Sequence, residues 1–339
     1  MSRRISAAVV QAAPIPLAIS DGLVDLQSRA AAAITSGADV VAFGESFIGG
    51  YPLWFDHAPG AAMWSHPGAQ ALHRILLDQA IRGRDPRLDP LQQLVDASGA
   101  LISFGAHERV RSSLYNTQYL LRPRLPAMLH RKLVPTHGER LLWGSGDGST
   151  LEAHRAPWGV IGSLICWEHW MPLLRATMHH SEEAVHVAAW PSVNDAHLLA
   201  SRSYAFEGRC FVLAAGTIQS RGDLLDGLAR VGGNAAAQAL LESIAEDVLQ
   251  TGRSAIIAPD GTIAARAGNG DELLLVDLDL DQIGGQLCTL DSDGHYSRPD
   301  IFQLTIDRSA RAGVTDLSAS NDVERPAISI VAAPAINAG

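Results

Sequence analysis

Three residues with chemically versatile side chains each follow a short apolar run of the sequence. Cys166 ends the run 160–165, Glu45 ends the run 39–44, and Lys132 follows the short stretch 128–131 and precedes a polar loop. If each run is a buried strand, the three side chains lie at strand ends, where α/β proteins commonly place their sites. A thiolate can act as nucleophile, a carboxylate as general base and an ammonium as a stabiliser of developing negative charge.

Each of these residues also has an ordinary structural explanation. A lone cysteine is often a small buried hydrophobic side chain, and single charged residues are usually solvated on the surface. The combination favours a site, because Glu45, Lys132 and Cys166 occur in this order and each follows an apolar run. Cys166 and His169 could instead be half of a metal site, but no second Cys/His pair with ligand spacing accompanies them, so we expect no metal.

Longer segments around these residues resemble the nitrilase branch of the carbon–nitrogen hydrolase superfamily. The matching segments are FGESFIGGYP at 43–52, RKLVPTHGER at 131–140, LICWE at 164–168, VAAWP at 187–191, AIIAPDG at 255–261 and HYSRPD at 295–300. The resemblance runs from Ile5 to about Phe302, and it departs from the family pattern at Gly49 and Arg253, where many relatives have proline and glycine. It implies an α/β fold, a four-layer α-β-β-α sandwich, in a single domain that we place at residues 1–306.

The resemblance also implies roles for four residues. Cys166 would attack the carbon of a small organic nitrile, Glu45 would act as general base, and Lys132 would stabilise the negative charge with help from the backbone N–H after Cys166. Glu139 is implied to orient the lysine or the base. The reaction would pass through a thioimidate and a thioester on Cys166 and release the carboxylic acid and ammonia, without a cofactor.

Aromatic and proline residues near the same segments are predicted to bind the substrate, because such side chains form an apolar pocket with little entropy to lose. These residues are Tyr51, Trp54, Trp167, Trp190 and Pro191. The alternative for Trp54 and Trp190 is that they cap the core. His169 and His295 are predicted to support the site without contacting the substrate.

Other activities remain open at this stage. The rivals within the superfamily are a cyanide- or nitrile-hydrating relative that yields an amide, and an aliphatic amidase with the same catalytic residues. The CWE segment with AAWP and HYSRP looks more like the nitrile-active branch. The alternative outside enzymes is a catalytically silent assembly protein of the same fold, and the intact set of Glu45, Lys132 and Cys166 argues against it.

The composition excludes some classes of protein. The 339 residues carry a formal net charge of −10 without clusters of Lys and Arg, which argues against a nucleic-acid partner. The 3 cysteines are widely spaced, as expected of free thiols in a reducing cytoplasm. No segment approaches the roughly 20 apolar residues of a membrane span, and the apolar start at 5–10 is too short for a signal peptide. We therefore expect a soluble cytoplasmic protein with no membrane partner.

Apolar periodicity predicts the secondary structure. Strands are predicted at 5–11, 39–43, 100–106, 115–121, 160–166, 185–189, 211–215, 254–258 and 273–277, and helices at 23–36, 67–82, 91–98, 171–179, 198–208 and 235–250. Residues 307–339, rich in small and polar residues, are predicted to form a C-terminal tail that is disordered or lies at an oligomer interface. The helix after Cys166 is unusually apolar, so we expect a homo-oligomer, and the resemblance implies a dimer that extends into a spiral.

Overall fold

The computed structural model describes residues 3–311. Contacts within the chain divide it into a compact unit, Met1–Ser309, and a second unit, Ala310–Gly339. Most of the predicted tail at 307–339 therefore lies outside the described residues, and its order and role stay predictions. Between residues 3 and 311, no helix is both long and apolar enough to cross a lipid bilayer.

Strands and helices alternate along the compact unit. The strands are β1 (Arg4–Gln11), β2 (Val40–Ala42), β3 (Leu101–Val110), β4 (Ser113–Arg122), β5 (Leu125–Arg131), β6 (His154–Ala156), β7 (Gly159–Ile165), β8 (Glu183–Ala189), β9 (Phe211–Ala215), β10 (Ile218–Ser220), β11 (Val248–Thr251), β12 (Ala255–Ile257), β13 (Ile263–Arg266) and β14 (Glu272–Asp279). The α-helices are α1 (Ile19–Thr35), α2 (Trp54–His57), α3 (Pro67–Gln79), α4 (Asp89–Ser98), α5 (Pro172–His179), α6 (Asp195–Gly208), α7 (Arg221–Arg230), α8 (Ala235–Glu242) and α9 (Asp281–Leu287), and the 3-10 helices are η1 (Pro86–Leu88), η2 (His137–Leu141), η3 (Gly148–Thr150) and η4 (Cys166–Trp170).

Most of the strands form two six-stranded sheets. Their orders are β14-β1-β2-β3-β4-β5 and β13-β12-β9-β8-β7-β6, and β10 pairs with β11 apart from them. Each sheet has three parallel strands at its centre, β1-β2-β3 in the first and β7-β8-β9 in the second, and antiparallel strands outside them. The central strands are almost continuously apolar, as is typical of parallel strands covered on both faces.

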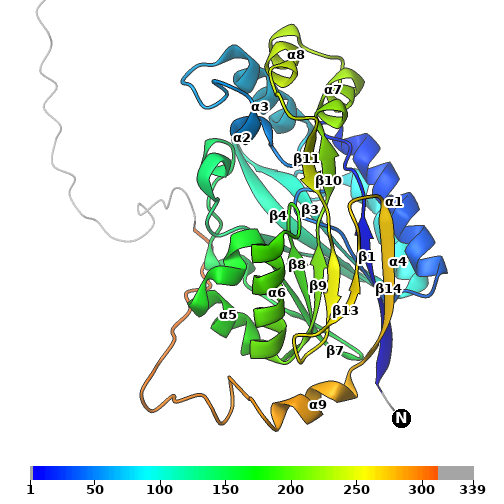
Figure 1. Ribbon diagram of the computed structural model, residues 1–339, viewed down its shortest axis with the longest axis vertical. Coiled ribbons are helices and arrows are strands. Elements are labelled where there is room, and N and C mark those ends of the chain that lie inside the picture. The colour runs from blue at the N-terminus through cyan, green and yellow to red at the C-terminus, as the bar shows by residue number, and fades with distance from the viewer. Residues whose placement is uncertain (1–2, 312–339) are drawn as a thin grey trace, which may run out of the picture. The chain divides into compact units, whose positions relative to one another are not determined.

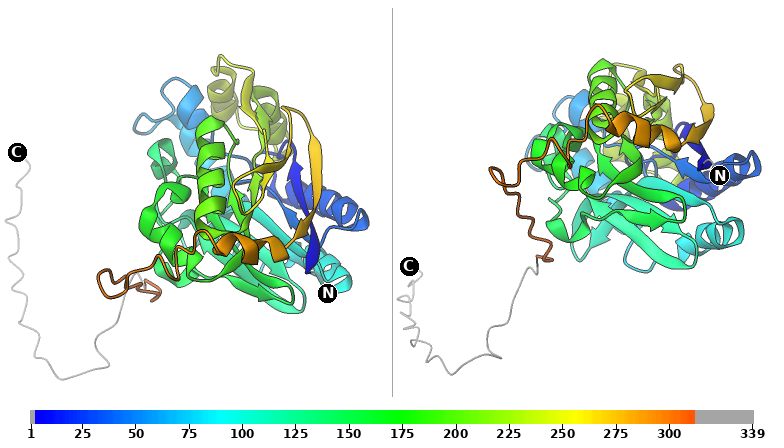
Figure 2. Two further views of the ribbon diagram at one scale, coloured as in Figure 1. Left: turned by 60° about the horizontal axis from the view of Figure 1, so that its bottom comes forward. Right: turned by 90° about the horizontal axis from the view of Figure 1, so that it is seen from below.

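The two sheets pack on each other, and helices cover their outer faces (Figures 1 and 2). The core between the sheets contains apolar side chains from both, among them Val9, Val40, Val187 and Leu213. A second core joins the first sheet to helices that include α1 and α4, and a third joins the second sheet to α5 and α6. The predicted four-layer α-β-β-α sandwich is confirmed.

Strand direction brings the three candidate residues to neighbouring edges. In the first sheet, β5 is antiparallel to β4 and β4 is antiparallel to β3, so β5 runs in the same direction as β2. Glu45, just after β2, and Lys132, just after β5, therefore lie at the same end of that sheet. Cys166 follows β7 in the second sheet, at the end where the central parallel strands terminate.

The predicted strands and helices match elements of the structure except in one helix, and several elements were not predicted, among them β5, β6, α2 and α9. The helix predicted at 235–250 is wrong in its second half, because α8 ends at Glu242 and residues 248–251 form β11. β11 pairs antiparallel with β10, a contact distant in the sequence that local periodicity cannot indicate. α7 was missed, although the capping box between Ser220 and Asp223 is a recognisable sign of its start.

A close backbone approach fixes the loop that carries Glu45. The loop runs beside β3, where Ile48 N donates to Gly105 O at 2.9 Å and Gly105 N donates to Gly44 O at 3.2 Å. A Cβ atom on Gly105 would overlap the backbone nitrogen of Ser46 and lie 2.8 Å from Gly44 O. Only glycine leaves room for this approach, since the colliding atoms belong to the backbone and cannot rotate away.

We therefore expect Gly105→Ala to displace the Glu45 loop. The free energy of unfolding should fall by about 1–3 kcal/mol, the usual cost of overpacking, and enzymatic activity should fall with it. The matched control is Gly284→Ala in α9, where a Cβ would meet no atom within 4 Å. Denaturant unfolding of both variants checks the prediction, and equal stability of the two would contradict it.

Candidate active site

Glu45 is held at the interface between the two sheets. Its backbone N–H donates to Trp190 O, beyond the end of β8, at 3.1 Å. Its side chain is completely buried, and Asn116 Nδ2 on β4 donates to Oε1 at 2.6 Å. The other oxygen, Oε2, has no hydrogen-bond partner among residues 3–311. One carboxylate oxygen is thus fixed while the other is free to accept a proton.

Lys132 links Glu45 to Glu139. Its Nζ atom lies 2.7 Å from Glu45 Oε1 and 2.8 Å from Glu139 Oε1, and all three side chains are buried. Glu139 is fixed in turn, because Tyr51 OH donates to Oε1 at 2.6 Å and Thr136 N donates to Oε2 at 2.7 Å. The contact with Thr136 is part of the capping box that starts η2.

Cys166 completes the cluster from the second sheet. It is 2% exposed, and its Sγ lies within 4.8 Å of carboxylate oxygens of both Glu45 and Glu139. Its backbone has φ of +54°, a left-handed conformation that is uncommon for a residue with a side chain. The prediction placed Cys166 in the strand, whereas the strand ends at Ile165 and Cys166 begins η4. The backbone N–H of Trp167 hydrogen bonds to the thiol.

The charges of the cluster bear on its chemistry. Burial raises the pKa of Glu45 to about 7, with a further rise from Glu139 and an opposing effect of Lys132. Burial also raises the pKa of the Cys166 thiol, although Lys132 partly counteracts it. Burial alone would lower the pKa of Lys132, but electrostatic interactions with Cys166, Glu45 and Glu139 outweigh it and the net shift is upward. The lysine is therefore a permanent cation.

The geometry of the cluster can also be compared with that of a metal site. Glu45, Glu139 and Cys166 present ligand atoms close enough together to hold an ion. The ammonium of Lys132 already lies within hydrogen-bonding distance of both carboxylates. The positive charge that balances these carboxylates is therefore supplied by a side chain of the protein.

Glu168 connects the segments that carry Lys132 and Cys166, and it was not predicted. Its buried carboxylate accepts hydrogen bonds from Ile165 N at 2.8 Å and Leu133 N at 2.8 Å, next to the two functional residues. His130 Nε2 lies 2.9 Å from the same carboxylate. Burial would raise the pKa of Glu168, but the charge of His130 and these hydrogen bonds lower it overall. Its position two residues after Cys166 was the available sequence signal.

The predicted substrate-binding residues lie in different environments. The hydroxyl of Tyr51 contacts Glu139 in the cluster, and Trp167 is next to Cys166 with its side chain 47% exposed. Trp54 is buried in the core outside the first sheet. Trp190 is fully buried between the rings of His169 and His197, with centroid distances of 4.8 and 4.3 Å.

The remaining predicted residues can be placed as well. Pro191 follows Trp190, and its carbonyl accepts hydrogen bonds from Thr217. His169 is buried behind Cys166, and its Nδ1 lies 2.8 Å from Cys166 O. His295 is exposed and contacts Asp291 and Tyr296, which do not belong to the cluster of Glu45, Lys132, Glu139 and Cys166. Binding roles for the aromatic and proline residues, and supporting roles for the histidines, stay predictions.

Comparison with known proteins agrees with this geometry. The family model described as carbon-nitrogen hydrolase matches residues 6–286. An aliphatic nitrilase of Sinorhizobium fredii (strain HH103) is 35% identical over 317 residues, which cover 92% of this chain and 98% of that protein. A nitrilase of Bradyrhizobium diazoefficiens is 36% identical over 318 residues, covering 92% of this chain and 95% of that protein.

A solved structure gives the same result for the fold. A CN-hydrolase superfamily protein from Xanthomonas campestris superimposes with a TM-score of 0.61 at 14% identity, over 86% of this chain and 96% of the other. Fold and family thus agree with the resemblance of the sequence segments. The chain belongs to the carbon–nitrogen hydrolase family.

Proposed function

We propose that this protein is a nitrilase that hydrolyses an organic nitrile to the carboxylic acid and ammonia. The observation that carries the proposal is the buried cluster of Cys166 with Glu45, Lys132 and Glu139, which combines a nucleophile, a base and a fixed cation. The relatives described above as nitrilases match nearly the whole chain. The experiment that tests the proposal is incubation with a panel of nitriles and amides, with assay of ammonia and of the acid.

The first half of the reaction forms a covalent intermediate. Cys166 Sγ attacks the nitrile carbon, and the thiol proton passes to Glu45 Oε2 and from there to the nitrile nitrogen, which gives a thioimidate. Because burial raises the pKa of the thiol, proton transfer accompanies the attack instead of preceding it. Lys132 and the N–H of Trp167 stabilise the negative charge that develops.

The second half releases both products. Glu45 takes a proton from water, which adds to the thioimidate carbon, and the protonated nitrogen leaves as ammonia to give a thioester. A second water hydrolyses the thioester by the same route and restores the thiol. Glu139 orients Lys132 throughout, since the two are 2.8 Å apart. If Cys166 leaves the tetrahedral intermediate before ammonia does, the product is an amide, so the acid-to-amide ratio separates a nitrilase from a hydrating relative.

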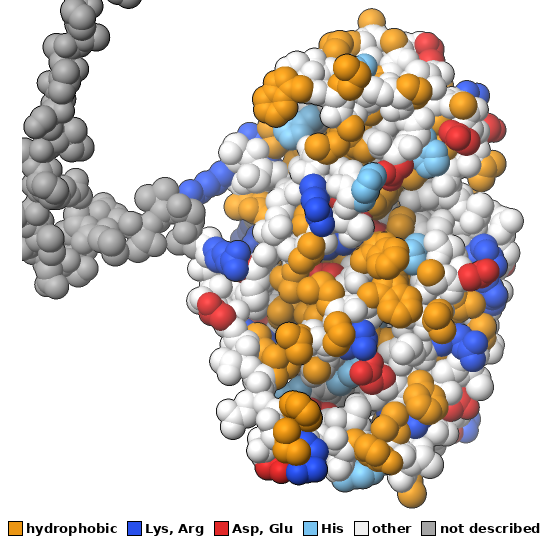
Figure 3. Space-filling view, turned by 60° about the vertical axis from the view of Figure 1, so that its left-hand side comes forward, with side chains coloured by type: hydrophobic (Ala, Val, Ile, Leu, Met, Phe, Trp, Pro, Cys, Tyr) orange, Lys and Arg blue, Asp and Glu red, His pale blue; other side chains and the backbone are white. Residues whose placement is uncertain are grey.

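The assembly and location of the protein are part of the proposal. Leu174 and Met178 of α5 are buried within the sandwich, so part of the apolar character of this helix is explained by its own core. Leu173 on α5, and Leu199 and Phe206 on α6, remain exposed, and hydrophobic side chains gather on this side of the molecule (Figure 3). These side chains support a homo-oligomer, with a spiral as the extended form. Free Cys166 supports a reducing compartment such as the cytoplasm.

Replacement of the nucleophile gives the most direct mutational test. Cys166→Ala should abolish ammonia release and leave the fold intact, because the change removes only the reacting atom. Cys210→Ala is the matched control, since Cys210 is equally buried in the same core but lies outside the cluster. Ammonia release by Cys166→Ala at a rate near that of Cys210→Ala would eliminate the nucleophile assignment.

The raised pKa of Glu45, the proposed general base, predicts that activity falls at acid pH, which we call the acid limb of the pH profile. Glu45 must be deprotonated to act, and its pKa is raised to about 7, so kcat/KM should fall as the pH falls through about 7. Glu45→Gln should lower kcat by roughly 10²–10⁴-fold, the usual contribution of a general base, and its residual activity should lack this limb. Steady-state kinetics from pH 5 to 9 provide the check, and an unchanged limb in the variant would assign it to another group.

The two tryptophans should behave differently. Trp167→Ala should raise KM for aromatic nitriles more than for short aliphatic ones and change the melting temperature little, because the side chain is half exposed beside Cys166. Trp190→Ala should lower the free energy of unfolding by about 3–5 kcal/mol, the usual cost for a core aromatic residue. Kinetics and thermal unfolding of both variants decide, and the opposite pattern would make Trp190 the pocket residue.

A further inference from the structure

A line of buried polar side chains runs away from Cys166 through the outer core of the second sheet. His169 Nδ1 lies 2.8 Å from Cys166 O, and His169 Nε2 lies 3.0 Å from His186 Nε2. His186 Nδ1 lies 2.9 Å from Glu183 Oε1, and Tyr204 OH donates to Glu183 Oε2. All of these side chains are buried, and the mechanism above uses none of them.

The hydrogen-bonding capacity of these groups fixes where the protons lie. A backbone carbonyl only accepts, so His169 Nδ1 must carry a proton and donate to Cys166 O. In a neutral imidazole, Nε2 of His169 is then an acceptor, and it must accept a hydrogen bond from the N–H at His186 Nε2. Nδ1 of neutral His186 is likewise an acceptor, and its partner is Glu183, 2.9 Å away. With both imidazoles neutral, the chain is complete only when Glu183 is protonated and donates to His186.

We propose that Glu183, His186 and His169 form a positioning chain for the nucleophile, in which protonated Glu183 directs every donor toward the Cys166 carbonyl. The proposal rests on the proposed function, because it concerns the residue that would attack the substrate. None of the three side chains touches the reacting atoms, so each acts through the backbone of Cys166.

The planarity of the peptide group explains how the chain reaches the chemistry. The Cys166 carbonyl and the Trp167 N–H belong to one rigid peptide unit, so a hydrogen bond that fixes the carbonyl also fixes the direction of the N–H. That N–H bonds to the Cys166 thiol and is the backbone donor of the proposed charge-stabilising site. A donor on the carbonyl also polarises the peptide and strengthens the N–H. It further holds Cys166 in its uncommon left-handed conformation.

The electrostatics of the chain agree with this assignment. Burial lowers the pKa of His169 to about 3 and that of His186 well below its ordinary value, so both imidazoles are neutral. Burial raises the pKa of Glu183 to about 8, with opposing effects of Tyr204 and His179. His186 on the same strand contacts this carboxyl, and Glu183 in turn contributes to a raised pKa of the Cys210 thiol before β9. Glu183 is therefore protonated at neutral pH.

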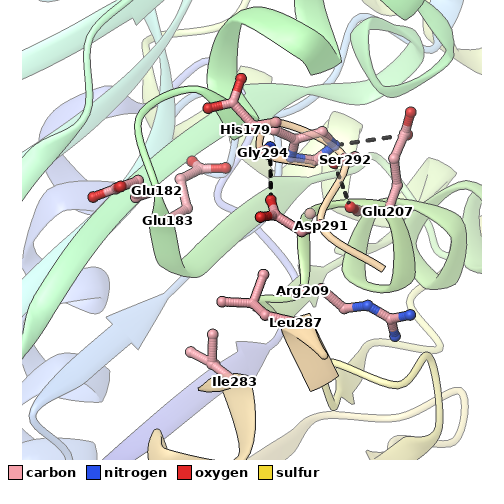
Figure 4. Close-up of a pocket in the computed structure, with 12 residues that line it drawn as sticks. His179, Glu182, Glu183, Glu207, Arg209, Ile283, Leu287, Asp291, Ser292 and Gly294 are labelled. Atoms are coloured by element: carbon pink, nitrogen blue, oxygen red, sulfur yellow. Dashed lines mark hydrogen bonds and ion pairs between the residues drawn. The ribbon is translucent and has the colours of Figure 1, made fainter. Parts of the chain in front are cut away.

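A cavity of about 470 Å³ gives protons access to the end of the chain. Glu183 lines it together with His179 from α5, Glu207 from α6 and Asp291 from the segment after α9 (Figure 4). When the pH rises through about 8, Glu183 loses its proton through this opening and becomes an acceptor. A neutral His186 must then reverse its donor, which turns His169 Nδ1 into an acceptor facing the Cys166 carbonyl, and the support of the nucleophile is lost.

Two substitutions at Glu183 separate this role from simple packing. In Glu183→Gln the amide can donate to His186 Nδ1 and accept from Tyr204, as the protonated acid does. Wild-type activity should decline above pH 8, whereas this variant should keep kcat near the wild-type value and lack that decline. Glu183→Leu has a similar volume but no donor. Its kcat should fall on the order of 10- to 100-fold, below the 10²–10³-fold loss that follows removal of an oxyanion donor.

His169→Phe tests the other end of the chain, because it keeps an aromatic ring against Trp190 but removes the donor to Cys166 O. It should match Glu183→Leu in kcat, with KM changed little. The pH profile of Glu183→Gln decides the question if either of these variants fails to fold. Equal kcat in wild type and folded Glu183→Leu would overturn the proposal. It would also be overturned if Glu183→Gln lost as much activity as Glu183→Leu, or if Glu183→Gln still lost activity above pH 8.

A second measurement makes the positioning chain testable without turnover. Iodoacetamide alkylation of Cys166, followed by mass spectrometry of the labelled peptide, reports thiol reactivity directly. Alkylation should be slower in Glu183→Leu and His169→Phe than in wild type, and similar in Glu183→Gln. If wild type hydrolyses no nitrile, the proposed function fails while this ranking still tests the chain. Equal alkylation rates in all four proteins would overturn the chain whatever the enzyme's substrate.

Discussion

The buried ammonium of Lys132 is the interaction on which the rest of the site depends. It lies between Glu45 and Glu139 at 2.7 and 2.8 Å, and all three side chains are buried. Two buried carboxylates that close together would otherwise repel each other and take up protons. The ion pair with Glu139 fixes the position of the lysine. The positive charge of the lysine opposes the effect of burial on Glu45, whose pKa is about 7, so this carboxyl group can both accept and return a proton.

The other polar contacts divide this network into fixed and reactive parts. Asn116 donates a hydrogen bond to Oε1 of Glu45. The carboxylate of Glu139 accepts hydrogen bonds from the Tyr51 hydroxyl and the N–H of Thr136. These donors fix the two carboxylates that contact Lys132. Glu45 Oε2 is the exception, since no donor in the described part of the chain reaches it. An unpaired buried oxygen is costly, and it is tolerated here because a substrate proton or an attacking water supplies the missing partner. Within the two carboxylates, proton transfer is therefore confined to one oxygen, Glu45 Oε2.

The sequence predicted the reactive residues better than their supports. Glu45, Lys132 and Cys166 stand at the ends of apolar runs, where strand direction alone brings them together. Asn116 and Glu183 lie within strands, and nothing local distinguishes them from other strand residues. Trp190 comes just after a strand, where the alternation of side chains between the two faces no longer applies, so its burial among His169 and His197 could not be foreseen. Where α8 ends and β11 begins depends on pairing with β10, which periodicity within one segment cannot reveal.

The site is divided between two sheets, and this makes catalysis depend on how they pack. The base and the cation come from the first sheet and the nucleophile from the second. Few hydrogen bonds tie these segments together, notably Glu45 N to Trp190 O and Leu133 N to the Glu168 carboxylate. The distance from thiol to base is therefore set mainly by the apolar core between the sheets, which contains residues such as Val40 and Val187. A close-packed core resists small displacements, and misplacement of reacting groups by about 1 Å can cost 10²-fold in rate. In this fold, packing between the sheets is consequently part of the catalytic geometry.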